Sequence, residues 1–142
     1  MTFGISTTLA AVQIAATLER INTGTGAASL HIYTDTRPAS VDVAPAQAAQ
    51  VVIALANPAG TITDGVLSLA ASAPSGVMVL ADGIPRWGRL FAADGAALAD
   101  GDVTDAAHGG DIQLLGGATP SGDTSPMLYA GGLVVLGSVA LT

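Results

Sequence analysis

Short apolar runs separated by glycine and proline limit the fold of this chain more than any other feature. Its 142 residues include 18 glycines and seven prolines, which recur between these runs. Turn residues at such short intervals favour many short strands over long helices. Aromatic residues make up only 4% of the chain, so a core has to consist of Val, Leu, Ile and Ala. The pattern predicts a mostly β domain with an aliphatic core.

The stretch from Ser75 to Leu98 shows this pattern most clearly. A continuous apolar run at residues 76–80 is typical of a strand that is covered on both faces. Residues 82–85, Asp-Gly-Ile-Pro, supply a turn, and residues 86–91 then alternate between two faces. We therefore expect two adjacent strands joined by a turn. The side chains that share one face of the second strand are Trp87, Arg89 and Phe91.

The segment near the N-terminus has helical periodicity instead. Thr7 or Thr8 can cap a helix that runs to about Ile21, and Asn22-Thr-Gly24 can end it. One apolar stripe consists of Ala11, Ile14, Ala15, Leu18 and Ile21, and a second consists of Leu9, Val12 and Ala16. A helix that is apolar on two sides is either buried or shared with a partner. We expect residues 1–24 to form a helical arm and residues 25–142 to form a β-sandwich domain.

The rest of the chain is expected to add further short strands. These lie at residues 29–34, 50–56, 66–70, 111–115 and 127–142, the last being one strand or a strand pair. Loops are predicted at residues 39–49, 99–110 and 116–126, and a turn at residues 57–60. About seven or eight short antiparallel strands are typical of a β-sandwich. We expect an all-β fold of this class, with a jelly-roll arrangement preferred and one N-terminal helix.

The charged residues exclude some classes of partner. Four Arg and no Lys stand against ten Asp and one Glu, which gives a net charge of −7. A chain with so few cations is poorly suited to nucleic acid or to an anionic membrane surface. Scarce Lys and Glu are typical of a surface covered by neighbouring molecules, because interfaces are depleted in both. GC-rich coding, which replaces Lys by Arg, is the alternative explanation.

Terminal segments and cysteine content add two expectations. The apolar N-terminal stretch lacks the positively charged start of a signal peptide, and the apolar run at residues 131–141 is too short for a membrane-spanning helix. The chain has no Cys, which excludes disulfides, thiolate zinc sites and a thiol nucleophile.

Four aspartates, Asp94, Asp100, Asp102 and Asp105, lie close together in the sequence. Oxygen-rich loops can hold calcium, but no Glu follows at the position that closes a helix–loop–helix calcium site. Asp-Gly pairs also form good turns, so a solvated turn region is the preferred explanation of these residues. We expect no metal site, and calcium at the segment from Asp94 to Asp105 stays an open alternative.

No residue pattern points to catalysis or to a cofactor. His31 and His108 are the only histidines, and no Gly-x-Ser-x-Gly motif places a nucleophile beside them. The glycine-rich stretches lack the Lys of a phosphate-binding loop. Glu19 with an Asp could form a glycosidase pair, but the chain has few aromatic residues on which a sugar could stack. We therefore expect a protein that is not an enzyme, without catalytic residues or cofactor.

The most distinctive side chains are suited to protein–protein contact. Trp and Arg are favoured interface anchors because they combine a large area with directed hydrogen bonds. A core Trp with Arg at the strand edges is the alternative for the segment from Arg86 to Phe91. The apolar stripe of the helix and the apolar C-terminal strand are further contact regions. The candidate interface residues are Leu9, Val12, Ala16, Arg86, Trp87, Arg89, Phe91, Leu133 and Val135.

Several phrases of the sequence resemble, in their order, one group of known proteins. The phrases are Leu18-Glu-Arg-Ile21, Leu30-His-Ile-Tyr-Thr-Asp-Thr-Arg-Pro38, Asp64-Gly-Val-Leu-Ser-Leu69, Arg86-Trp-Gly-Arg-Leu-Phe91 and Gly101-Asp-Val103. The group consists of small structural proteins of tailed-bacteriophage virions. The resemblance extends over most of the chain and carries no catalytic residue.

This resemblance implies a component of the phage particle, assembled in the bacterial cytoplasm. We expect a capsid decoration or cement protein that binds the major capsid protein and further copies of itself, as a dimer or trimer. The alternative within the virion is a tail, neck or baseplate component. A glycan-binding module is a third hypothesis, and the low aromatic content argues against it.

Overall fold

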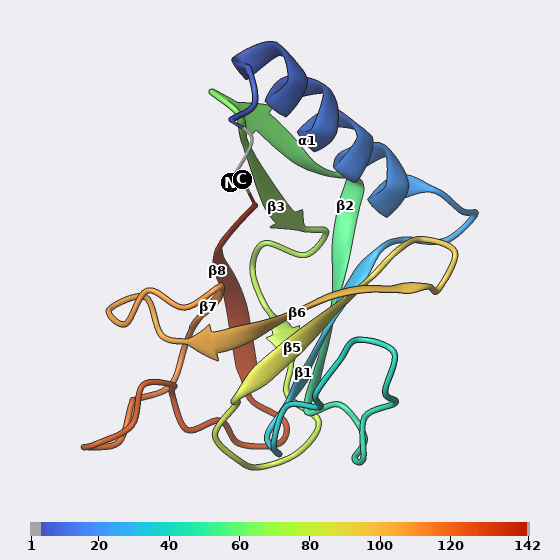
Figure 1. The fold of residues 1–142 in the computed structure, drawn as a ribbon. Helices are drawn as coiled ribbons and strands as arrows, with labels where there is room; N and C mark the ends of the chain where they lie inside the picture. Colours follow the sequence, from blue (N-terminus) through green and yellow to red (C-terminus); the bar gives the residue numbers. More distant parts are fainter. Residues whose placement is uncertain (1–3, 142) are drawn as a thin grey trace.

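Eight strands and one helix make up the part of the chain that the structure, a computed structural model, describes, which is residues 4–141. The elements are α1 (Thr7–Asn22), β1 (Ser29–Tyr33), β2 (Val51–Thr63), β3 (Val66–Ala71), β4 (Val77–Met78), β5 (Trp87–Phe91), β6 (Ala97–Thr104), β7 (Ile112–Leu115) and β8 (Leu133–Leu141). Figure 1 shows the strands wrapped around one core, with α1 at one end and the long loops at the other. Within residues 4–141, no helix is both long and apolar enough to cross a membrane.

Seven of the strands close into a barrel in the order β3-β2-β1-β5-β6-β7-β8, and the eighth, β4, pairs with β8 beside it. The pairing of Leu67 with Leu141 and of Ser68 with Ala140 joins β3 to β8 and closes the ring. Neighbouring strands are antiparallel except β6 and β7, which are parallel. The predicted β-sandwich and jelly roll are therefore wrong. Alternation along each strand indicates an inner face, but it does not reveal whether the last strand meets an earlier one.

The expected hairpin between residues 76–80 and 86–91 does not form. β4 has only two residues and pairs with β8, while β5 lies between β1 and β6. The segment between them crosses the end of the barrel, where the Leu80 amide donates to the Gln50 carbonyl and Gly83 forms a bridge with Leu128. The turn residues at 82–85 therefore lie between β4 and β5, but the two strands do not pair with each other.

Two further boundaries differ from the prediction. Residues 57–60 lie within β2, which carries a bulge between Leu55 and Gly60 and continues to Thr63. The side chain of Asn22, at the end of α1, accepts a hydrogen bond from the Ala59 amide in this bulge. The predicted acidic loop at 99–110 contains most of β6, because β5 offers this segment a complete antiparallel partner.

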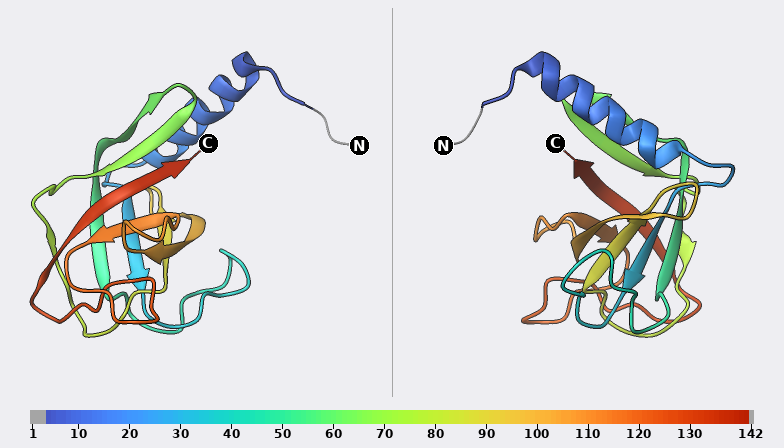
Figure 2. Two further views of the ribbon diagram at one scale, coloured as in Figure 1. Left: turned by 90° about the vertical axis from the view of Figure 1, so that its left-hand side faces the viewer. Right: turned by 45° about the vertical axis from the view of Figure 1, so that its right-hand side comes forward.

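The predicted helix is confirmed, with Ser6 as its N-cap in place of Thr7 or Thr8. The Ser6 hydroxyl accepts the Leu9 amide at 3.1 Å, which satisfies one of the free donors in the first turn. Ile14 and Ile21 are buried in the same aliphatic cluster as the barrel interior. Both views of Figure 2 show α1 lying along the end of the barrel that β2 and β3 form.

Candidate functional site

The predicted interface residues from Arg86 to Phe91, on and just before β5, are divided between the interior and the surface. Trp87 and Arg89 are only 1% and 2% exposed, beneath the chain's own loop of residues 34–49. Arg86 is about half exposed and forms an ion pair with Asp123 at 2.9 Å. The Phe91 ring lies 4.4 Å from the ring of His31 on β1. The two largest candidates on this strand thus have their contacts within the chain.

Arg89 and Asp100 form a buried ion pair between directly opposite residues of β5 and β6. The guanidinium donates from Nε to Oδ1 at 2.6 Å and from Nη2 to Oδ2 at 2.9 Å. Nη1 also donates to the Val43 carbonyl at 2.7 Å. The hydrogen bonds to Asp100 raise the pKa of Arg89 above its usual range. This pair holds the 34–49 loop against the outside of the barrel.

Trp87 completes this cluster. Its ring stacks on Tyr33 at 4.4 Å, and the Arg89 guanidinium lies 5.3 Å from the Trp87 ring centre. The indole Nε1 donates to the Asp35 carboxylate at 3.0 Å. Burial raises the pKa of the Tyr33 hydroxyl. The Trp87 indole and the Arg89 guanidinium thus have their hydrogen-bond partners within the same chain and serve the fold.

The four crowded aspartates do not converge on one point. Asp94 accepts from the Ala96 amide and Arg20, Asp100 from Arg89, Asp102 from Arg37, and Asp105 from His108 and Thr119. Each carboxylate therefore has its own partner. Within residues 4–141, no group of three or more His, Cys, Asp or Glu side chains is placed to hold a metal ion.

Each histidine has a side-chain partner of the kind found in catalytic arrangements: His31 Nε2 lies 3.1 Å from the Ser29 hydroxyl, and His108 belongs to a group with Asp105 and Thr119. The His108 Nδ1 lies 2.6 Å from one oxygen of Asp105, and the Thr119 hydroxyl donates to the other. The carboxylate thus stands between the hydroxyl and the imidazole, whereas a nucleophile has to contact the base itself. These hydrogen bonds, led by that of Thr119, lower the pKa of Asp105. The arrangement joins two loops and activates no nucleophile.

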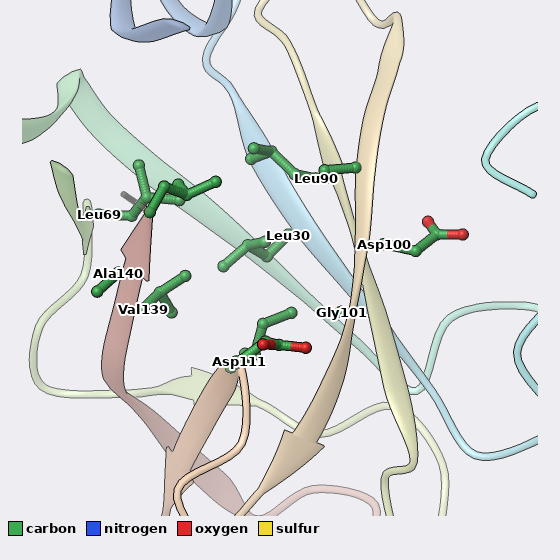
Figure 3. A pocket seen from close by; sticks show the side chains of 11 residues that line it. Leu30, Leu69, Leu90, Asp100, Gly101, Asp111, Val139 and Ala140 are labelled. Atoms are coloured by element: carbon green, nitrogen blue, oxygen red, sulfur yellow. The ribbon is translucent and has the colours of Figure 1, made fainter. Parts of the chain in front are cut away.

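The barrel interior opens into one small cavity between β6 and the end of β8 (Figure 3). Its volume is about 190 Å³, below the roughly 300 Å³ at which small-molecule sites begin. Most of its lining is aliphatic, and Asp100 points away from it towards Arg89. Asp111, which also lines the cavity, already accepts a hydrogen bond from the Asp102 amide at 3.0 Å. The cavity is therefore a packing gap in the barrel and a poor ligand site.

The helix exposes the second apolar stripe that the sequence shows. Leu9 is 45% exposed and Val12 is 61% exposed, and Ala16 is exposed beside them. These residues lie on the side of α1 opposite to Ile14 and Ile21, which are buried against the barrel. Figure 2 shows that neither strands nor long loops cover this outer side. We call it the α1 stripe.

A second apolar surface lies on the outside of β4, β7 and β8. Leu133 is 65% exposed and pairs directly with Met78, and Val135 pairs with Leu115. We define the β8 patch as Met78, Leu115, Leu133 and Val135. The sequence pattern predicts Leu133 and Val135 as contact residues but gives no sign of the other two. Only the pairing of β8 with β4 and β7 brings these side chains together.

The described surface therefore offers two apolar faces, and no group of three or more metal-ligating side chains is assembled within residues 4–141. Contiguous exposed apolar surface of this kind marks sites of protein interaction. Comparisons of the chain with protein-family models, with curated proteins and with solved structures found no match.

Proposed function

We propose that this chain is a non-enzymatic structural protein of a tailed-bacteriophage virion that decorates and stabilises the capsid. The observation that carries the proposal is the β8 patch, an apolar surface shared by three adjacent strands. Scattered exposed apolar residues are ordinary, but a cluster in direct cross-strand contact favours docking to another protein. The phrasing that the sequence shares with phage structural proteins supports the same role.

The mechanism of such a protein is adhesion. Burial of apolar surface contributes about 25 cal/mol per Å² removed from water, so a patch of several Leu, Met and Val side chains can anchor a copy to the shell. A ligand that binds only the folded, assembled capsid stabilises it by mass action. The partner in this proposal is the major capsid protein, and the location is the virion, assembled in the bacterial cytoplasm.

The copy number of the chain in purified particles tests the proposal. Quantitative mass spectrometry against the major capsid protein should find on the order of hundreds of copies, because a symmetric shell repeats its binding sites. On the order of ten copies would overturn the capsid role in favour of a tail, neck or baseplate ring. Absence from the particle would overturn the virion role altogether.

A charged substitution then tests the β8 patch itself. Leu133→Glu places a carboxylate at the centre of the docking face, where its desolvation weakens binding. We expect about a tenfold or greater loss of copies per particle, which corresponds to about 1.4 kcal/mol. Ile62→Glu changes an exposed apolar residue of β2 and is the matched control. Equal copy numbers for both variants would show that the patch does not bind the shell.

A further inference from the structure

We propose that α1 joins two copies of the chain as an antiparallel helix pair around a two-fold axis. The contact surface is the α1 stripe of Leu9, Val12 and Ala16. Steps of three and four residues place these side chains in one line along the helix, as at the core positions of a coiled coil. This inference concerns the purified protein and does not depend on the proposed virion role.

A second copy is the partner that fits the stripe. A line of side chains with this spacing is best covered by another helix, which inserts its own side chains between them. Within residues 4–141, α1 is the only helix, so the covering helix has to come from another molecule. The barrel already occupies the opposite side of α1, where Ile14 and Ile21 are buried. A second copy therefore meets the free side alone.

The side-chain sizes fit an antiparallel pair centred on Val12. In this arrangement the two Val12 side chains meet at the two-fold axis. Leu9 of each copy then lies across from the turn that carries the small Ala15 and Ala16 of the other, so a large residue faces small ones on both sides of the axis. The small side chains allow the two backbones to approach closely. A parallel pair would instead oppose Leu9 to Leu9 and Ala16 to Ala16.

The charges on the helix also favour the antiparallel arrangement. Glu19 continues the α1 stripe, seven residues or about 10 Å beyond Val12. Its carboxylate forms no ion pair with any residue in the described part of the chain. The neighbouring Arg20 is directed to Asp94 instead, at 3.1 Å. In the antiparallel pair, Glu19 lies beside the partner's helix N-terminus, whose first turn has no acidic residue. A carboxylate is favourable there, whereas a parallel pair would place two like charges together.

This geometry also sets the number of copies. An antiparallel pair of identical helices is a two-fold contact that uses the same surface on both molecules, so association stops at two. A trimer would need the parallel arrangement that the charges disfavour. The β8 patches stay free on the outside of both barrels, which allows a dimer to dock onto a further protein with both of them.

Light scattering of the full chain behind a sizing column gives the first test. At tens of micromolar we expect twice the 13.8 kDa of one chain. Val12→Glu and Val12→Lys should each give a monomer, because each variant opposes two like charges at the axis. An equimolar mixture of the two should recover the dimer. Leu133→Glu is the matched control and should stay dimeric, since Leu133 lies in the β8 patch.

Disulfide trapping distinguishes the antiparallel helix pair from the parallel one. The chain has no native Cys, so only the introduced cysteines can cross-link. Cross-linking requires Cα atoms within about 7 Å, which only opposite residues satisfy. A mixture of Leu9→Cys and Ala16→Cys chains should cross-link, whereas Leu9→Cys alone should not. A wild-type monomer or trimer, a dimer that survives Val12→Glu, or efficient cross-linking of Leu9→Cys alone would overturn the proposal.

Discussion

Removal of the buried guanidinium at Arg89 should destabilise the protein more than any other single loss of charge. Arg89→Met retains most of the side chain's length and apolar contact but leaves the Asp100 carboxylate without its partner. Both side chains are 2% exposed, so water cannot replace the lost hydrogen bonds. Breaking a buried pair by removing one partner costs about 3–5 kcal/mol, because an uncompensated charge remains in the interior.

The same change releases the loop of residues 34–49. Arg89 donates to the Val43 carbonyl at 2.7 Å and to the Ser40 carbonyl at 3.3 Å, and Met offers neither bond. Replacing both partners, as in Arg89→Met with Asp100→Leu, removes the uncompensated charge. We expect this double variant to recover part of the lost stability and to leave the loop more mobile, because its two carbonyls still lack their donor.

Urea unfolding and thermal melting measure the effect. For a domain of this size, a loss of about 3–5 kcal/mol lowers the melting temperature by roughly 10–20 °C. Arg20→Met is the matched control, because Arg20 and Asp94 form an ion pair that is substantially exposed on both sides. Such an exposed ion pair contributes little to stability. Hydrogen exchange at residues 40–43 should accelerate in Arg89→Met and stay unchanged in Arg20→Met.

An Arg89→Met variant that loses no more stability than Arg20→Met would contradict this prediction. That result would mean that the Asp100 carboxylate reaches water in solution and that the loop does not seal it. A double variant less stable than Arg89→Met would contradict the assignment of the cost to an unpaired charge.

Three further predictions concern the core, one close approach and pH. Ile21→Ala, at a fully buried residue of α1, should cost about 2–5 kcal/mol in urea unfolding, and an effect below about 1 kcal/mol would show that the helix is not part of the core. Gly60→Ala should destabilise strongly, because the new Cβ would clash with the Ser68 carbonyl oxygen, whereas Gly4→Ala meets no atom within 4 Å and should melt like wild type. Burial lowers the pKa of His31 below 6.5, so the unfolded chain binds that proton more tightly. Stability should be fully present above pH 6.5 and decline as the pH falls through the lowered folded pKa, as urea midpoints would show. His31→Gln should remove this decline, and an unchanged decline would assign it to other groups.

Local patterns in the sequence determined the elements whose structure depends on their own residues. The periodicity of residues 7–22 specified α1 and both of its apolar sides, because helical hydrogen bonds and capping groups come from neighbouring residues. Alternation likewise located β1. Even the α1 stripe could be identified in this way, since residues three and four apart share one side of any helix.

Which strand pairs with which was decided by the tertiary structure alone. The segment at 76–80 looked like half of a hairpin, yet Met78 pairs with Leu133 and β5 pairs with β1. A strand's alternation specifies which face is buried, but many other strands can satisfy its backbone donors and acceptors equally well. Closure of the barrel through β3 and β8 is a contact between segments about seventy residues apart in the sequence, and no local signal encodes it.

The same distinction applies to the candidate site. The composition of β5 singled out Trp87 and Arg89 as large contact residues, but whether they face solvent or their own chain depended on where the 34–49 loop lies. The β8 patch exists because pairing places Met78 and Leu115 beside Leu133 and Val135. The sequence by itself determined which side chains are apolar and which share a face within one element. The tertiary structure decided which of those faces are covered, because burial depends on segments that are distant in the chain.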